Sequence, residues 1–116
     1  MPLIQVHLNT NAPDNLSEFQ NTLSEVVATG VDKSENYVMT RVAANQAISF
    51  GRSTEPAAYV EVKNIGTLTP TQTGELSGKI CKAIEACTAV KSDRIYIEFA
   101  DAQRHLWGWN GRTFAT

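Results

Sequence analysis

The first ten residues, MPLIQVHLNT (residues 1–10), set the architecture of the chain. Between positions 3 and 10 apolar residues alternate with polar ones, and Ile4, Val6 and Leu8 are the apolar set. A period of two is typical of a half-buried strand, which shows one face to the core and the other to water. We therefore predict a strand over residues 3–10, in a sheet that is covered on one side.

A helix and a second strand are predicted next. The turn-forming residues 13–15 precede a run of apolar residues at helical spacing, and Gly30 is the expected helix stop. Residues 37–44 then have the pattern of a strand. Residues 48–56, ISFGRSTEP, are predicted to form a short strand or a bend.

The second half of the chain repeats this order. A strand is predicted over residues 57–65. The segment TPTQ is typical of a helix start, because Thr69 can cap the helix, Pro70 suits its first position and Gln72 can close a capping box. One face of this helix carries the apolar residues Leu76, Ile80, Ala83, Ile84 and Cys87.

Two glycines interrupt the second helix, and a strand and a hairpin follow it. Gly74 and Gly78 lower the helix propensity, and we expect them to permit close packing. A strand is predicted over residues 93–101, and residues 105–116 are predicted to form a short hairpin-like end.

The two halves together predict one α/β domain over residues 1–116. VDKSENYV after the first helix resembles AVKSDRIYI after the second. Two strand–helix–strand units with right-handed crossovers place both helices on one face of a four-stranded mixed sheet. The other face would stay uncovered, and its exposed residues would include Gln5, His7, Asn9, Glu61, Lys63, Tyr96 and Glu98. Open sheet edges invite pairing with other chains, so a closed cyclic assembly is expected.

Composition narrows the classes of function. Of the 116 residues 42% are hydrophobic and 19% are charged, and the formal net charge is −2. No cluster of Lys or Arg is present, so a nucleic-acid partner is not expected. No stretch approaches the ~20 apolar residues of a membrane span, and no basic, apolar leader opens the sequence. We therefore expect a cytoplasmic protein with no membrane partner and no signal peptide, while secretion by a non-classical route stays open.

Cysteine and histidine give no sign of a metal or redox site. Cys81 and Cys87 stand six positions apart in one predicted helix, on different faces and too far apart for a disulfide. We expect both to be small buried hydrophobic residues. His7 and His105 are expected to face a channel or the surface, and no metal or cofactor is predicted.

Several short segments, taken together and in order, carry a resemblance to a known family. They are the opening Met-Pro, KSENYVMTRV, ISFGRSTEP, VKNIGTL, SDRIYIEFAD and GWNGRTFA, and they span nearly the whole chain. The sequence resembles the macrophage migration inhibitory factor (MIF) family of the tautomerase superfamily. The resemblance implies a homotrimer whose sheets surround a central channel, with active sites at subunit interfaces. It also implies keto–enol tautomerase activity on aromatic 2-keto acids such as phenylpyruvate and on dopachrome-like substrates.

Pro2 is the candidate catalytic residue. A tautomerase moves a proton between carbon and oxygen, so it needs a base that is neutral at working pH. If Met1 is removed, Pro2 carries a free secondary amine, and an α-amine has a pKa of roughly 7.7–8.0 that an apolar pocket lowers. If Met1 is kept, the nitrogen is a tertiary amide that cannot act as a base, and Pro2 only caps the edge of a strand.

The resemblance implies further residues of the site. Lys33 and the backbone N–H of Ile65 would hold the substrate carboxylate, and Lys33 would also stabilise negative charge on the enolate oxygen. Tyr96 would reach the site from the neighbouring subunit. Trp109 and Phe114 would wall the pocket and stack on an aryl group.

Some positions depart from the best-known members of the family. Glu98 replaces an asparagine beside the reacting centre, where a carboxylate would repel an anionic substrate and raise the pKa of the amine. Lys63 replaces a histidine and is expected to offset that charge in part. Trp107 replaces a smaller aliphatic residue and is expected to narrow the mouth of the pocket. Ala57 and Val60 occupy the positions of a CxxC motif, which excludes oxidoreductase activity of that type. We therefore expect an enzyme of modest activity.

Two other functions stay open. The chain could be a cytokine-like secreted ligand of a protein receptor, with weak or vestigial tautomerase activity. It could also be a trimeric scaffold without chemistry. The sequence favours the enzyme, because the proline, the lysine and the aromatic walls are all present.

Overall fold

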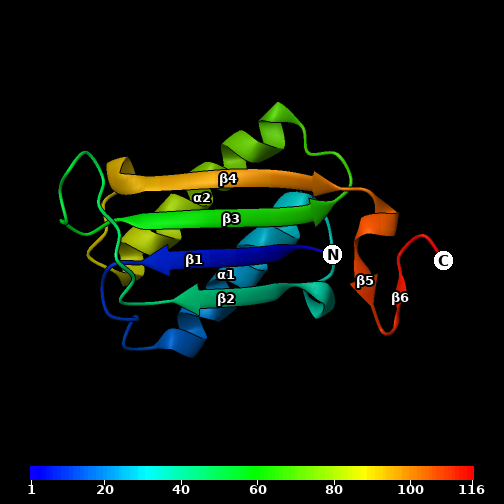
Figure 1. Ribbon diagram of the computed structural model, residues 1–116, viewed down its shortest axis with the longest axis horizontal. Coiled ribbons are helices and arrows are strands. Elements are labelled where there is room, and N and C mark those ends of the chain that lie inside the picture. Colours follow the sequence, from blue (N-terminus) through cyan, green and yellow to red (C-terminus); the bar gives the residue numbers. More distant parts are fainter.

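The computed structural model describes all residues from 1 to 116 as a four-stranded sheet with two helices packed on one face (Figure 1). The strands are β1 (Leu3–Leu8), β2 (Met39–Ala43), β3 (Ala58–Ile65) and β4 (Ile95–Ala102), with a small hairpin of β5 (Gly108–Trp109) and β6 (Arg112–Thr113) near the C-terminus. The helices are α1 (Leu16–Val31) and α2 (Pro70–Cys87), and three short 3-10 turns are η1 (Glu35–Tyr37), η2 (Ser92–Arg94) and η3 (Arg104–Leu106). No helix is long and apolar enough to span a bilayer.

The order of strands in the sheet is β2-β1-β3-β4. β1 pairs in parallel with β2, β3 pairs in parallel with β4, and the central β1 and β3 are antiparallel. Each parallel pair is joined by one crossover helix. The two strand–helix–strand units and the mixed sheet predicted from the sequence are therefore confirmed.

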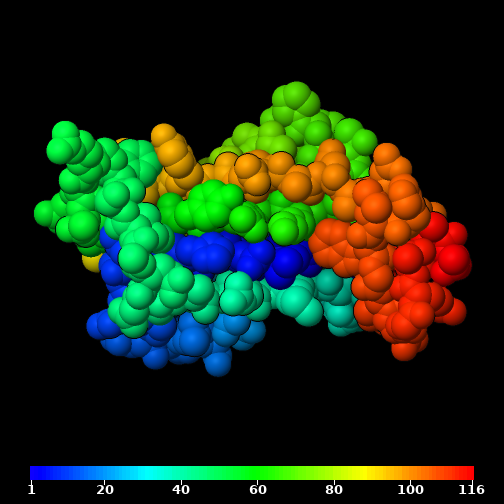
Figure 2. Space-filling model, in the orientation of Figure 1, coloured from blue at the N-terminus to red at the C-terminus, as the bar shows by residue number.

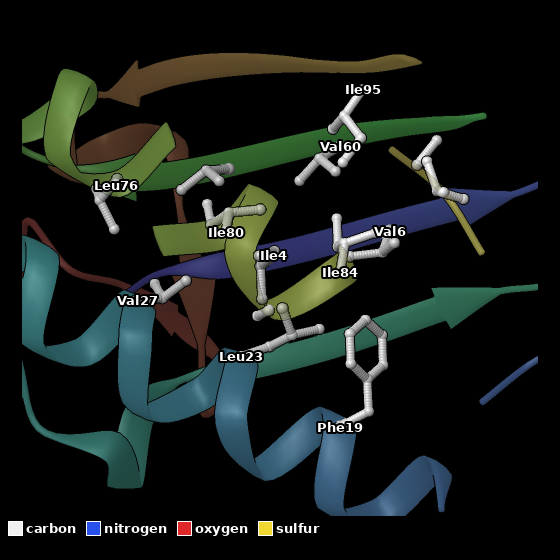
Figure 3. Close-up of a cluster of buried hydrophobic side chains, with 14 of the residues drawn as sticks. Ile4, Val6, Phe19, Leu23, Val27, Val60, Leu76, Ile80, Ile84 and Ile95 are labelled. Atoms are coloured by element: carbon white, nitrogen blue, oxygen red, sulfur yellow. The ribbon is translucent and has the colours of Figure 1, made fainter. Parts of the chain in front are cut away.

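The core lies between the sheet and the two helices. Ile4, Val6 and Leu8 point from β1 into it and are completely buried. Figure 3 shows Phe19 and Leu23 approaching Ile4 and Val6 from α1, as Ile80 and Ile84 do from α2. The alternation in the first ten residues thus marks the covered face, although the strand ends at Leu8 rather than at position 10.

The capping of the two helices agrees with the sequence at the start of α2 and differs from it at the end of α1. At the start of α2, the Thr69 side chain accepts the N–H of Gln72, and the Gln72 side chain accepts the N–H of Thr69, which confirms the predicted capping box. The predicted stop of α1 at Gly30 is wrong. The helix continues to Val31, and Asp32 caps it in a left-handed conformation with φ of 56°. Gly30 instead provides space for a side chain of α2, because a β-carbon there would lie 2.2 Å from Leu76 Cδ2.

Other expectations along the helices and strands also need correction. Gly74 and Gly78 do not permit close packing, because an added β-carbon at either would meet nothing within 4 Å. Cys87 is exposed, while Cys81 is half-buried against the core, and both thiols are free. Tyr37 belongs to a 3-10 turn before β2 rather than to the strand.

Asn9 fixes the long loop between β2 and β3. Its side-chain amide donates to the carbonyls of Ile48, Thr54 and Glu55, at 3.2, 3.3 and 3.0 Å. Its carbonyl accepts the N–H of Ala57 at 2.8 Å. The prediction that Asn9 belongs to the exposed side chains of the open face is therefore wrong, because the side chain is half-buried and bonds the backbone of the loop instead.

The face of the sheet opposite the helices carries a polar network. Arg41 donates to Gln5 (2.9 Å), and Gln5 donates to Glu61 (3.0 Å). Glu61 also accepts the Tyr59 hydroxyl (3.1 Å) and pairs with Lys63 (3.8 Å). Figure 2 shows this face as an open surface between the β2–β3 loop at one end and the C-terminal segment at the other. The predicted uncovered face is confirmed for the single chain.

Candidate functional site

Pro2 lies at the end of the sheet from which β1 starts, beside the C-terminal hairpin. It is buried, and its carbonyl accepts the N–H of Met39 at 3.1 Å. Since β1 and β2 are parallel, with Leu3 opposite Met39, the turn that leads into β2 lies at the same end. This brings Tyr37, two residues before Met39, to the N-terminal end of the chain.

A cavity of about 400 Å³ opens next to Pro2 and has aromatic walls. It is lined by Met1, Pro2, Leu3, Asn36, Tyr37, Val38, Met39, Trp107, Gly108, Trp109 and Phe114. The Trp109 and Phe114 rings stack with centroids 5.9 Å apart and an angle of 9° between their planes. Tyr37 meets Trp109 edge-on, at 6.1 Å and 82°. None of the lining residues carries a charged side chain, so the cavity suits an apolar, planar group.

The tight turn of the C-terminal hairpin positions Trp109 and Phe114. Asn110 and Gly111 link β5 to β6 and have positive φ values of 54° and 78°. An Asn-Gly pair is favoured in two-residue hairpin turns because both positions need positive φ. Behind the turn, the Phe114 N–H bonds the Trp107 carbonyl at 3.1 Å. The predicted hairpin-like end is confirmed, and it carries three of the predicted site residues.

A second cavity beside the amino terminus is lined by two cationic side chains. A small cavity of about 60 Å³ is lined by Met1, Lys33, Ile65, Arg104 and Phe114. Lys33 and Arg104 also line a larger, more polar cavity of about 800 Å³, together with Ile65, Gly66, Thr67, Asp101, Ala102, Gln103, His105 and Ala115. Met1 and Phe114 border both the aromatic cavity and the small cationic cavity.

The helix cap after α1 positions Lys33. Asp32 takes the left-handed cap conformation, and the Lys33 N–H then bonds the carbonyl of Ala28 at 2.9 Å. Ile65 is the last residue of β3 and lies opposite Ala102, the last residue of β4. The carboxyl ends of β3 and β4 and the end of α1 therefore meet near the amino terminus.

The local environment disfavours a charged amine at this end of the chain. Burial lowers the pKa of the Met1 amine below its usual value, and the nearby Lys33 ammonium lowers it further. Both causes act in the same direction, because each destabilises a positive charge. Pro2 is buried next to the half-buried Met1, so an amine on Pro2 would lie beside the same groups.

The structure gathers six of the predicted site residues at one end of the chain. Around the N-terminus lie Pro2, Lys33, Ile65, Trp107, Trp109 and Phe114. Tyr96 and Glu98 are not among them. Tyr96 pairs with Tyr59, which pairs with His7, four residues and about 13 Å along the sheet from Leu3. Tyr96 instead packs on Phe50, with ring centroids 4.9 Å apart.

Glu98 is exposed on the open face, in the same row of the sheet as Glu61 and Gln5. Lys63 was expected to offset the charge of Glu98, but its carboxylate partner is Glu61, at 3.8 Å. The register places Lys63 opposite Ala100 rather than opposite Glu98. The expected offset of the Glu98 charge stays a prediction.

Sequence reasoning missed Tyr37 and Arg104. A signal for Tyr37 was available, because parallel strands of a βαβ unit begin at the same edge of a sheet, and so the residue just before β2 must lie near the residue just before β1. Arg104 had no such signal, because its position depends on η3, a turn between β4 and the hairpin that no motif predicts. No group of three or more His, Cys, Asp or Glu side chains is arranged to hold a metal ion.

Comparison with known proteins supports the same family throughout. The family model described as Macrophage migration inhibitory factor (MIF) matches residues 1–115. A curated homolog from Trichinella spiralis is 32% identical over 114 residues, which is 98% of this chain and 100% of that protein. A homolog from Brugia malayi is 35% identical over 109 residues, 92% of this chain and 95% of that protein.

Solved structures agree with the observed fold. The crystal structure of a macrophage migration inhibitory factor homologue from Prochlorococcus marinus is 40% identical, with a TM-score of 0.93, and the match covers 97% of this chain and 98% of the other. The structure of the factor from Trichinella spiralis is 30% identical, with a TM-score of 0.88 and coverage of 96% and 98%. The predicted fold and the resemblance noted from the sequence are both confirmed.

Proposed function

This chain belongs to the macrophage migration inhibitory factor family, and we propose that it is a keto–enol tautomerase of aromatic 2-keto acids such as phenylpyruvate. Membership supports an isomerase of the tautomerase superfamily or a cytokine-like role. The finer proposal, including dopachrome-type isomerisation as a related activity, rests on the geometry around Pro2.

The observation that carries the proposal is the position of the amino terminus between two unlike cavities. On one side stand the aromatic walls of Tyr37, Trp109 and Phe114, and on the other side stands Lys33. An aryl 2-keto acid has an apolar ring at one end and a carboxylate at the other. When the ring lies in the aromatic cavity and the carboxylate faces Lys33, the carbon between ring and carbonyl lies next to Pro2.

Pro2 then moves the proton. After removal of Met1, its neutral amine takes a proton from the carbon next to the carbonyl, and the electrons of that C–H bond form the enolate. Lys33 stabilises the negative charge on the substrate while the enolate exists. The protonated amine returns the proton to the enolate oxygen, which gives the enol and restores the base. The environment that lowers the pKa of the Met1 amine would act in the same direction on an amine at Pro2, and this suits the cycle because the base must start neutral near pH 7.

A homotrimer completes the proposal. The polar face of the sheet is uncovered, and the two outer strands β2 and β4 have free edges in the single chain. Tyr96 and Glu98 lie on that face, away from Pro2 of their own chain. We propose that a neighbouring subunit brings these two residues to the site, which would close the sheet edges in the same step.

The cytokine-like role is the alternative. It needs a surface for a protein receptor and does not need an amino terminus between an aromatic and a cationic cavity. The cavity arrangement therefore favours the enzyme. If the protein binds a receptor and lacks tautomerase activity, the alternative is correct.

The test is the enol–keto conversion of phenylpyruvate by wild-type protein and by Pro2→Gly, after intact mass has shown that Met1 is absent from both. Pro2→Gly keeps an α-amine but replaces the rigid secondary amine of proline with a flexible primary one. Since general acid–base catalysis contributes on the order of 10²–10⁴-fold, kcat/KM should fall by about 10²-fold, the lower end of that range. Pro13→Gly is the matched control, because Pro13 borders a different cavity near the start of α1. An unchanged kcat/KM in Pro2→Gly would contradict the proposal.

A further inference from the structure

Two cations face one small cavity beside the amino terminus. Lys33 follows α1 and Arg104 begins η3, and together with Met1, Ile65 and Phe114 they form the whole lining of the 60 Å³ cavity. No carboxylate belongs to this lining. Two positive charges brought together without an acid between them repel one another, and a bound anion relieves that repulsion.

Neither cation has a carboxylate partner elsewhere. The ion pair in the structure joins Lys63 to Glu61, on the open face of the sheet. Asp101 lines the larger neighbouring cavity, but its carboxylate accepts the backbone N–H of Leu68 at 3.3 Å. The guanidinium of Arg104 and the ammonium of Lys33 are therefore free to bind an incoming acid.

The turn that carries Arg104 also leads into the aromatic wall. η3 comes directly after β4, and its backbone is closed by bonds from Leu106 to Gln103 (2.9 Å) and from Trp107 to Arg104 (3.4 Å). Trp107 then lines the aromatic cavity. One short turn thus places a cation on one side of the amino terminus and an aromatic side chain on the other.

We propose that Arg104 is a second carboxylate-binding residue, and that the carboxylate of the aryl 2-keto acid is held between Arg104 and Lys33. The proposal rests on the function proposed above and deepens it. A guanidinium can bond both carboxylate oxygens at once, which fixes the plane of the group, whereas an ammonium acts as a point charge. Arg104 therefore fixes the orientation of the carboxylate, while the Lys33 ammonium contacts it as a point charge and also stabilises the enolate.

The two-cation site should recognise an acid even when no reaction takes place. A suitable probe is 3-phenylpropanoate, which has the ring and the carboxylate but no carbonyl. Its neutral counterpart is 3-phenylpropanamide. The ring of each fits the aromatic cavity, and only the acid can use Arg104 and Lys33.

The experiment is calorimetric titration of both probes into the wild-type protein, Arg104→Gln and Arg104→Lys, each shown by intact mass to begin with Pro2. Both cations are exposed, so the loss of one charged hydrogen bond should have an effect near the lower end of its usual range. We expect Arg104→Gln to weaken the binding of 3-phenylpropanoate about tenfold, and Arg104→Lys to weaken that binding less. The amide should bind equally to all three proteins. The KM for phenylpyruvate should rise in Arg104→Gln by a similar factor.

Arg112→Gln is the matched control, because it removes the same charge from the same C-terminal segment at a residue that borders neither cavity. It should leave the affinity for 3-phenylpropanoate unchanged. If Arg104→Gln binds the acid as tightly as wild type while phenylpyruvate is still converted, the inference about Arg104 is wrong and the proposed function stands. If Arg104→Gln weakens the binding of 3-phenylpropanoate but the wild-type protein does not convert phenylpyruvate, the proposed function is wrong and the carboxylate site stands.

Discussion

Gly30 in α1 touches the Leu76 side chain of α2 so closely that a β-carbon at position 30 would lie 2.2 Å from Leu76 Cδ2 and 2.6 Å from Leu76 Cγ. Leu76 is completely buried and has little room to move. The contact lies one turn before Lys33, at the end of α1 that positions this cation. The glycine therefore sets how closely the two helices approach beside the site.

Gly30→Ala should destabilise the protein. The added methyl group must displace Leu76 or push the helices apart, and overpacking of this kind costs about 1–3 kcal/mol of unfolding free energy. Gly74→Ala is the matched control, because a β-carbon there meets nothing within 4 Å. That change should raise the unfolding free energy by about 0.5–1 kcal/mol through helix propensity. Urea denaturation of both variants measures the difference, and equal stability of the two would contradict the packing account.

Arg94→Lys should loosen the β2–β3 loop although the charge is kept. The guanidinium bonds the carbonyls of Pro56, Phe50, Ser53 and Glu55 at 2.9 to 3.3 Å, and it lies over the Phe50 ring at 5.3 Å from the centroid. A lysine cannot bond several carbonyls in this planar arrangement. The unfolding free energy should fall by about 1–3 kcal/mol.

Hydrogen exchange provides the local readout for this variant. The N–H groups of Phe50 and Ser53 bond one another's carbonyls, and both should exchange faster in Arg94→Lys. The Gln72 N–H at the start of α2 should keep its exchange rate, because its cap is distant from the loop. Unchanged exchange at Phe50 and Ser53 would show that the arginine does not hold the loop.

Glu98→Asn should raise kcat/KM for phenylpyruvate. Glu98 is exposed, and Lys63 is paired with Glu61 instead of with it. If a neighbouring subunit brings this carboxylate to the site, it repels the anionic substrate and raises the pKa of the base. An equal or lower kcat/KM in the asparagine variant would refute the charge argument. Glu85→Gln, on α2, serves as the control for the loss of one negative charge.

The pH dependence of kcat/KM should report the lowered pKa of the amine. Burial and Lys33 both lower the pKa of the Met1 amine. We expect the same two causes to act on the Pro2 amine once Met1 is removed, so the neutral base should form at a lower pH than in a free peptide. Activity should rise with pH and level off below roughly pH 8, the usual range for an α-amine. Lys33→Gln removes one of the two causes, so its profile should move to higher pH. A profile that stays in place would show that Lys33 does not act on the base.

Much of the fold could be predicted because its signals are local. The alternation of Ile4, Val6 and Leu8 identifies the covered face of β1, and the segment from Thr69 to Gln72 contains every group of its capping box. The packing role of Gly30 could not be predicted from local sequence signals. Its role depends on Leu76, which meets it only after both helices have packed, whereas a glycine at the end of a helical pattern looks like a stop.

The site could be predicted only where the family motifs fall. Pro2, Lys33 and Trp109 lie in recognised segments, and the structure brings them to one end of the sheet. Arg104 lies in a turn without a motif, so its approach to Lys33 becomes visible only in three dimensions. Tyr96 lies far from Pro2 in its own chain, and its proposed role across a subunit interface stays a prediction because a single chain does not show the assembly.

The most direct test compares two forms of the same protein, one that begins with Pro2 and one that keeps Met1, separated after expression with and without an inhibitor of methionine aminopeptidase and identified by intact mass. The quantity measured is kcat/KM for the enol–keto conversion of phenylpyruvate. We predict that the form beginning with Pro2 is active and that the form keeping Met1 shows only the uncatalysed rate, because an amide nitrogen cannot take the proton. Equal kcat/KM for the two forms would contradict the assignment of Pro2 as the base.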